Sequence, residues 1–480
     1  MRAGARLFAV AAGAVLLAGM CAFTPHAANA VGGDLIVTAA PVYAPLKELR
    51  GEERFPRGAQ LLLVHEGKAA PLVTGFAATA DADVSWDAKT VLFAGKKTAG
   101  DRWQIWEMRL ADGSVRKAIA TATDAERPLY LPGGRMVWAE RTAYGFGIES
   151  AEDGDLANAT YLNPTAGPGV LALTYIHTSA FPTDVLADGR ILFESGFPLG
   201  QGSTPELYAM YADGSGVEAY RCDHGRARWG GAQLASGDVV FTHGASLARF
   251  TSALAHEEAV AAPRAEYAGG IAETASGAWL VSARAAGETH YAIELWKPHA
   301  PAGSGPARLE NVLAVKGADL VEPVLVAPRA RPRRFPSGLH PWNYANLLAL
   351  DARVSLDGDL KGTPATVRLE SLDAEGHVIA HGAAPVAADG SFFVKTPADQ
   401  PIRFILLDRK GEVLRRERGW FWIRDGEQRI CVGCHAGPAR SPENRVPEVL
   451  LRSTTPVDLT SASGAVRAAM RAGLPGGGAR

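Results

Sequence analysis

An internal repeat governs residues 31–327 of this 480-residue chain and constrains its fold more than any other feature. Each unit is a polar turn that runs into a short apolar strand, and consecutive units lie 40 to 55 residues apart. Five such strands end at Phe93, Trp138, Phe193, Phe241 and Val281. Four short strands per period of this length are typical of a β-propeller, and helical periodicity is almost absent. The repeat therefore predicts an all-β chain that begins with a β-propeller over residues 31–327.

The turns of the repeat contain Asp-Gly pairs, as at residues 112–113, 188–189 and 213–214. Together with the aromatic strand ends, these turns resemble the TolB-like and WD40-like propeller repeats. The length of the region predicts six blades, closed by pairing of an N-terminal strand near residues 35–38 with the last repeat near residues 313–326. Core packing and turn geometry explain most of these aromatic and Asp-Gly positions, so the propeller is expected to be a scaffold.

A proline- and arginine-rich segment follows the repeat and predicts a domain boundary. Residues 321–342 contain five prolines and four arginines, so residues 328–346 are expected to form an extended, semi-rigid linker. Residues 347–430 then alternate short apolar strands with polar turns, which predicts a small immunoglobulin-like or transthyretin-like β-sandwich. A final strand is expected at Trp420 to Ile423, where Trp420 and Trp422 either wall a bound cofactor or fill the sandwich core.

The run Cys-Val-Gly-Cys-His after this sandwich is a CxxCH motif. Two thiols at this spacing reach the two vinyl groups of one porphyrin, and the following histidine falls beneath the iron. Cys431 and Cys434 are therefore predicted to attach one haem c covalently, with His435 as an axial iron ligand. A zinc site would need a second ligand pair and a thioredoxin-like pair would need a strand-to-helix setting, and neither pattern occurs. Residues 431–480 are predicted to be a haem attachment segment and tail.

The N-terminus has the pattern of a secretory signal peptide. Arg2 and Arg6 precede an apolar run, and Ala28-Asn29-Ala30 offers a small-residue cleavage site, so residues 1–30 are expected to be removed on export. Export agrees with the haem motif, because c-type haem is attached outside the bacterial cytoplasmic membrane, and it predicts a periplasmic protein. No membrane span is expected after cleavage. Lys plus Arg at 49 nearly balances Asp plus Glu at 51, so no nucleic-acid partner is expected.

Residues 389–435 resemble the family related to the hydrazine synthase alpha subunit, in the runs D-G-S-F-F-V-K-T-P and R-D-G-E-Q-R-I-C-V-G-C-H. The resemblance implies an exported protein in which a six-bladed propeller precedes a β-rich domain that ends in a c-type haem. It also implies that Cys431 and Cys434 are the thioether sites and that His435 is the motif histidine. In the synthase subunit a tyrosine a few residues past the motif is the haem ligand, whereas this chain has Ala439 in that region. Hydrazine synthesis itself is therefore not expected.

Two functions from different classes follow from the sequence, which identifies no catalytic residue. The first is a periplasmic single-haem c-type cytochrome in electron transfer or redox sensing, with the propeller as a docking scaffold for a redox partner protein. The second is a haem enzyme, an oxidoreductase with an open iron site for a small nitrogen or oxygen compound, in the manner of hydrazine synthase-related proteins. The sixth iron position separates them. It is either open or filled by one of Met470, His340, His377 and His381.

Overall fold

The computed structural model describes residues 31–152, 170–198, 204–220, 227–252, 255–298, 308–355, 358, 360–417, 419–433 and 444–461. This part of the chain is almost entirely strand, and its short helical elements are η1 (Glu48–Arg50) and α2 (Glu448–Arg452). The prediction of an all-β chain is therefore confirmed. No helix in the described ranges is long and apolar enough to cross a membrane. The expected signal peptide, residues 1–30, lies outside the described residues.

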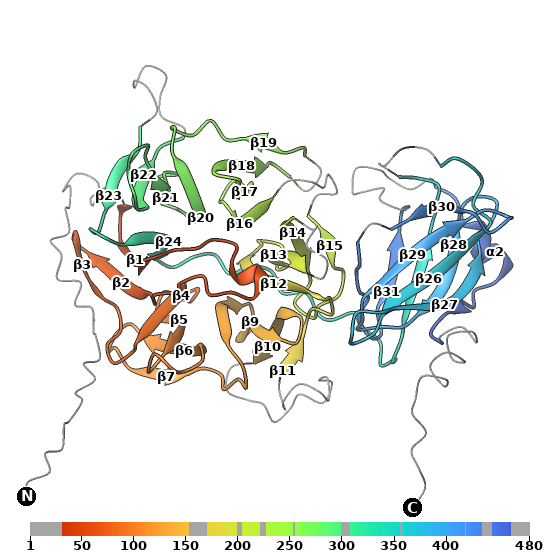
Figure 1. Cartoon of the computed structure of the whole chain (residues 1–480), viewed down its shortest axis with the longest axis horizontal. Coiled ribbons are helices and arrows are strands. Elements are labelled where there is room, and N and C mark those ends of the chain that lie inside the picture. The colour runs from red at the N-terminus through yellow and green to blue at the C-terminus, as the bar shows by residue number, and fades with distance from the viewer. Residues whose placement is uncertain are drawn as a thin grey trace, which may run out of the picture.

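Six four-stranded antiparallel sheets occupy the described residues from Asp34 to Val326, and Figure 1 shows them arranged around a common centre. This arrangement is that of a β-propeller. The innermost strands of the sheets are β4 (Ala78–Val84), β8 (Ala125–Leu131), β12 (Thr178–Val185), β16 (Arg228–Gln233), β20 (Glu266–Glu273) and β24 (Asp319–Val326). The remaining propeller strands are β1 (Asp34–Ala40), β2 (Gln60–His65), β3 (Lys68–Pro71), β5 (Thr90–Lys96), β6 (Gln104–Arg109), β7 (Val115–Lys117), β9 (Arg135–Thr142), β10 (Gly145–Glu152), β11 (Val170–Ala172), β13 (Ile191–Pro198), β14 (Glu206–Met210), β15 (Glu218–Ala219), β17 (Val239–His243), β18 (Ser246–Phe250), β19 (Glu258–Ala259), β21 (Trp279–Arg284), β22 (Ala292–Trp296) and β23 (Glu310–Leu313).

The two ends of the propeller sequence meet in one sheet. Strand β1 lies between β24 and β2, with Leu35 opposite Leu325 and Thr38 opposite Val321. Residues from both ends also share one apolar core, in which Leu35 and Leu320 are fully buried. The predicted pairing of the N-terminal strand with the last repeat agrees with this register. The pairing of the first and last propeller strands closes the ring. Breaking this pairing would therefore open the ring and expose the shared core to water.

The second part of the structure is a sandwich of two sheets around one apolar core. The core includes Leu347 and Val394 from one sheet and Val367 and Phe404 from the other. The first sheet is mixed, in the order β31-β25-β28-β32, with β31 parallel to β25 at one edge. The second sheet has the order β27-β26-β29-β30. The strands are β25 (Ala345–Ala349), β26 (Thr366–Leu372), β27 (Val378–Pro385), β28 (Phe392–Thr396), β29 (Ile402–Leu407), β30 (Val413–Arg416), β31 (Gln428–Cys431) and β32 (Val457–Asp458).

The strand expected at residues 420–423 is not formed, and Trp422 does not fill the sandwich core. Only Phe421 makes a strand-like bridge, to Ile402. Trp422 is 2% exposed and packs into a propeller core, with its ring 6.4 Å from that of Phe193. Trp420 is covered by the Arg403 guanidinium, 4.2 Å from the ring centroid. Phe421 packs against the sandwich core, whereas the next side chain, Trp422, packs into the propeller.

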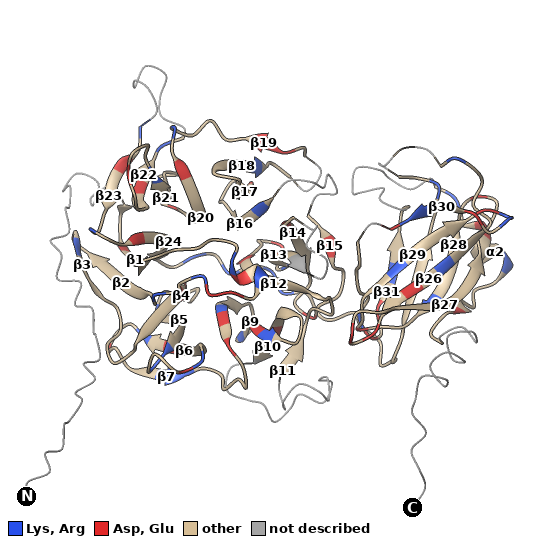
Figure 2. Ribbon diagram, viewed as in Figure 1, with Lys and Arg blue, Asp and Glu red and all other residues tan. Residues whose placement is uncertain are grey.

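Polar contacts reinforce this junction between propeller and sandwich. Arg424 is buried, donates to Asp399 at 2.9 Å within the sandwich and donates to the backbone carbonyl of Asp213 in the propeller at 3.2 Å. Glu427 accepts a bond from the backbone N–H of Gly216 at 3.2 Å. Figure 2 shows that acidic and basic residues are interspersed over both parts and that a group of them lies near the centre of the ring. The junction therefore combines an inserted tryptophan with paired charges.

Candidate functional site

The predicted haem attachment begins at the end of β31, the edge strand of the sandwich. Cys431 pairs in parallel register with Ala349, and Leu350 donates to its carbonyl at 2.8 Å. Its thiol is half-buried and is free of any disulfide within the described residues. Burial raises the pKa of this thiol, and the nearby Arg429 guanidinium partly offsets that rise. Cys434 and His435 lie outside the described residues.

The backbone after Cys431 is held against the turn that follows β25. Asp351 donates to the carbonyl of Val432 at 3.2 Å. A Cβ atom at Gly433 would lie 2.7 Å from the carbonyl oxygen of Val354, so this spacer position admits only glycine. The Cys431 side chain packs against the sandwich core, whereas Ile430, the residue before it, points to the opposite face of the strand and exposes 66% of its surface. A free, partly buried thiol on a fixed backbone at the end of an edge strand fits the first attachment point of a haem.

The three histidines named as sixth-ligand candidates stand in different environments. His340 is exposed, stacks on Trp342 at 4.3 Å and contacts Gln428 at the start of β31. His377 lies in the exposed turn between β26 and β27. His381 is buried and hydrogen-bonded to Ser371 at 2.8 Å, and burial lowers its pKa. Met470 lies outside the described residues. The described chain places none of the three histidines in contact with Cys431.

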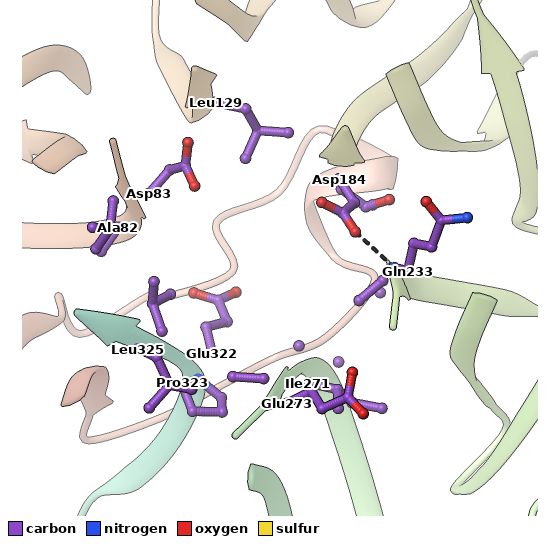
Figure 3. Close-up of a pocket in the computed structure, with 18 of the residues that line it drawn as sticks. Ala82, Asp83, Leu129, Asp184, Gln233, Ile271, Glu273, Glu322, Pro323 and Leu325 are labelled. Carbon is purple, nitrogen blue, oxygen red and sulfur yellow. Dashed lines mark hydrogen bonds between the residues drawn. The ribbon is translucent and has the colours of Figure 1, made fainter. Parts of the chain in front are cut away.

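A second candidate site, which the sequence did not indicate, is the central channel of the propeller. It contains a cavity of about 550 Å³ lined by the innermost strand of every propeller sheet. Figure 3 shows the carboxylates of Asp83, Asp184, Glu273 and Glu322 around this space. Pockets of this size commonly bind small molecules. The channel is therefore a second place in the described structure where a small molecule could bind.

Corresponding bulges in the inner strands direct charged side chains toward the channel. Asp81, Arg127 and Glu322 have left-handed backbone conformations, with φ of 59°, 51° and 58°, at bulges of β4, β8 and β24. The equivalent positions of β16 and β20 are Gly230 and Gly270, with φ of 64° and 87°. Each non-glycine residue in this region costs roughly 1 kcal/mol. The strain is tolerated because neighbouring sheets and ion pairs hold each residue in place.

One end of the channel is closed by the loop between β1 and β2, residues 41–59, here called the loop end. Arg54 on this loop is 2% exposed and forms ion pairs with Asp81 and Glu322 on the inner strands. Glu48 on the same loop pairs with Arg127, which also pairs with Glu194 at 2.8 Å. Burial raises the pKa of Glu48 and of Glu322, and the arginines partly counter that rise. The loop is thus fixed across the channel by buried charges.

The opposite end, here called the linker end, has a different charge balance. Asp83 accepts from the backbone N–H of Tyr130 at 2.8 Å and pairs with Arg329 of the linker at 2.6 Å. Asp184 accepts only backbone N–H bonds among the described contacts, including that of Gln233 at 2.6 Å, and its pKa is raised to about 6 by burial. The alternation of polar and apolar residues in the sequence did not indicate that these carboxylates face the channel. Each bulge adds one residue to an inner strand, so a side chain that simple alternation would point away from the channel points into it.

The described geometry defines a class of protein: a β-propeller with a charged central channel, joined through an inserted tryptophan to a β-sandwich whose edge strand β31 ends in a free cysteine. Residues 361–436 match the family model of the hydrazine synthase alpha subunit middle domain. This segment therefore belongs to the hydrazine synthase alpha subunit-related family, and the resemblance noted in the sequence is confirmed. The matched residues contain the sandwich strands from β26 to β31 and the whole CxxCH motif.

Comparison of folds agrees with this assignment. Hydrazine synthase of Kuenenia stuttgartiensis is 17% identical, with a TM-score of 0.73, and the match covers 88% of this chain and 71% of that chain. At this identity the match shows a shared fold. TolB of Acinetobacter baumannii is 14% identical over 61% of this chain and 66% of its own, with a TM-score of 0.43. No curated protein sequence matches the chain significantly.

Proposed function

We propose that the chain is an exported, periplasmic redox protein with a six-bladed propeller and one covalent haem c. Cys431 and Cys434 would hold the haem, with His435 as an axial iron ligand. The observation that carries this proposal is the free Cys431 thiol, presented at the end of a hydrogen-bonded edge strand where the CxxCH motif begins. A bound haem supplies one-electron chemistry at the iron.

The residues around β31 support a role in electron transfer or redox sensing. Cys431 packs against the apolar core of the sandwich, which holds the attachment point in place. Arg429 donates to the backbone carbonyls of Trp422 and Val217, and the latter contact ties β31 to the propeller. A one-electron carrier needs a rigidly held haem with an accessible edge, and a propeller joined to a sandwich is an ordinary docking scaffold for a redox partner protein.

A second candidate function is a haem enzyme that acts on a small nitrogen or oxygen compound. The match of residues 361–436 to the hydrazine synthase alpha subunit middle domain favours it in general terms. Catalysis by such a centre usually needs acid and base groups beside the bound molecule. The carboxylates of Glu417 and Glu427 lie near the Cys431 thiol, but Glu427 already accepts bonds from the backbone N–H groups of Gly216 and Arg424, so little acid or base capacity is left near the motif in the described chain. Electron transfer is therefore the function we place first.

The two functions are separated by the reactivity of the reduced protein. The full chain is expressed with a c-type maturation system, reduced, and mixed with carbon monoxide while its absorption spectrum is recorded. Electron transfer predicts a spectrum unchanged by carbon monoxide and a reversible one-electron titration. Rapid carbon monoxide binding, together with turnover of hydroxylamine or peroxide above the rate of free haem, would establish the enzyme instead. The Cys431→Ser variant, assayed in parallel, controls for loosely bound haem.

A further inference from the structure

The linker end of the propeller channel carries two carboxylates, Asp184 and Glu273, that form no direct ion pair within the described chain, although the Arg329 guanidinium acts on Asp184 at longer range. Asp184 on β12 bonds to backbone N–H groups of Val185 and Gln233. Glu273 on β20 accepts one bond, from the backbone N–H of Ala235 at 2.7 Å, through a single oxygen. Both face the cavity, as Figure 3 shows. Each carboxylate therefore retains capacity to accept bonds from a ligand.

The arginines that line the same cavity are already engaged. Arg329 pairs with Asp83 at 2.6 Å, and its guanidinium lies 4.1 Å from the ring centroid of Trp86. Arg127 pairs with Glu48 and Glu194 at the loop end. An anionic ligand would therefore have to displace an existing carboxylate. A cation needs no such exchange, because it meets two carboxylates that form no direct ion pair in the described chain.

The spacing of the carboxylates argues against a single metal ion. In the described chain, groups of three or more metal-ligating atoms within 4.8 Å of one another occur only at Asp373, Glu375 and His377, in an exposed turn of the sandwich. A calcium ion needs six to eight oxygens at about 2.3–2.6 Å. Asp184 and Glu273 instead stand on β12 and β20, with β16 between them. A ligand that contacts both carboxylates therefore has to reach past β16, which favours an extended organic molecule over a single ion.

The cavity is large enough for such a molecule and reaches the surface at this end. Its volume is about 550 Å³, within the range of small-molecule pockets. Ala235, Ala275 and Pro328 line it and are exposed to solvent. The loop end is closed by residues 41–59, so a ligand would enter from the linker end. We propose that this channel binds a small organic dication of the aliphatic diamine class, with one ammonium group on Asp184 and the other on Glu273.

The proposal is independent of the haem and is tested by calorimetry on the full chain. Putrescine is titrated at low ionic strength, with 1,4-butanediol and succinate as neutral and anionic molecules of the same chain length. Putrescine alone is expected to bind. Loss of one charge-assisted bond in Glu273→Gln should weaken binding about tenfold to a hundredfold. The glutamine keeps an oxygen for the Ala235 N–H, so folding should be preserved, as near-ultraviolet circular dichroism would verify.

Two further variants make the result decisive. Asp184→Asn should weaken binding to a similar degree, whereas Glu288→Gln, in the exposed turn between β21 and β22, should leave it unchanged. The proposal is overturned if putrescine does not bind, if the diol or succinate binds equally well, or if calcium binds in its place. It is also overturned if both channel variants bind putrescine with the affinity of the wild type.

Discussion

Replacing Trp422 with alanine should uncouple the sandwich from the propeller. The indole is 2% exposed and lies in a propeller core cluster that includes Val137, Ile148 and Phe193. A buried tryptophan removes roughly 200 Å² from water. At about 25 cal/mol per Å² this burial contributes ~5 kcal/mol, in line with the ~3–5 kcal/mol lost in Trp→Ala substitutions in cores. Because the side chain bridges two units, most of this loss should appear as weaker docking.

Limited trypsin digestion of the full chain measures that docking directly. The linker between β24 and β25 contains four arginines, and cleavage there should become much faster in Trp422→Ala while each fragment stays folded. Trp420→Ala is the matched control, since this ring is half-buried beneath Arg403 and away from the junction. Equal cleavage rates and equal melting temperatures in the wild type and Trp422→Ala would refute the inserted-tryptophan account of the junction.

Three other perturbations test the channel and the buried charges. Arg54→Met should lower the free energy of unfolding by ~3–5 kcal/mol in chemical denaturation, because it leaves buried carboxylates without their cationic partner. Arg54→Lys should cost less, because it keeps a positive charge. Equal stability of Arg54→Met and the wild type would contradict the charge network. Burial raises the pKa of Glu126 and of Glu149 to about 8, so between about pH 4.5 and 8 the folded state holds protons that the unfolded state has released. Stability should therefore fall as pH rises through that window, by up to about 1.4 kcal/mol per unit for each group, and glutamine at both positions should flatten the profile; an unchanged slope would refute the shifts. Gly230→Ala should destabilise strongly, since its Cβ would lie 2.6 Å from the neighbouring strand's backbone, whereas Gly237→Ala meets open space and should cost only its backbone strain; similar melting temperatures would contradict the close approach.

Periodicity predicted the features that depend on alternation and turns. The Asp-Gly turns and apolar strand ends indicated an all-β propeller, and the first strand near Leu35 pairs with the last as expected. The resemblance in residues 389–435 is likewise confirmed by the family match. Each of these rests on a local pattern, namely strand length, turn residues or a short motif, which a single sequence displays without reference to distant contacts.

The features that sequence reasoning missed are set by tertiary contacts. Trp422 lies in an apolar run whose sequence pattern predicts a place in the sandwich core. Its burial is explained only by the propeller that packs around it. Asp81, Arg127 and Glu322 interrupt the alternation of their strands and would ordinarily be placed facing solvent. Their inward direction follows from bulges, which leave no clear local signature when the bulged residue is charged rather than glycine. The channel was therefore visible only in three dimensions.

The central claim, that Cys431 and Cys434 carry a covalent haem, is tested most directly by a haem stain of the denatured chain. The full chain is exported in cells with a c-type maturation system, denatured, separated by electrophoresis and stained for haem peroxidase activity. The account predicts a stained band at the size of the mature protein, absent from the Cys431→Ser, Cys434→Ser double variant although that variant is still exported. An exported, folded wild-type chain without stain would contradict it.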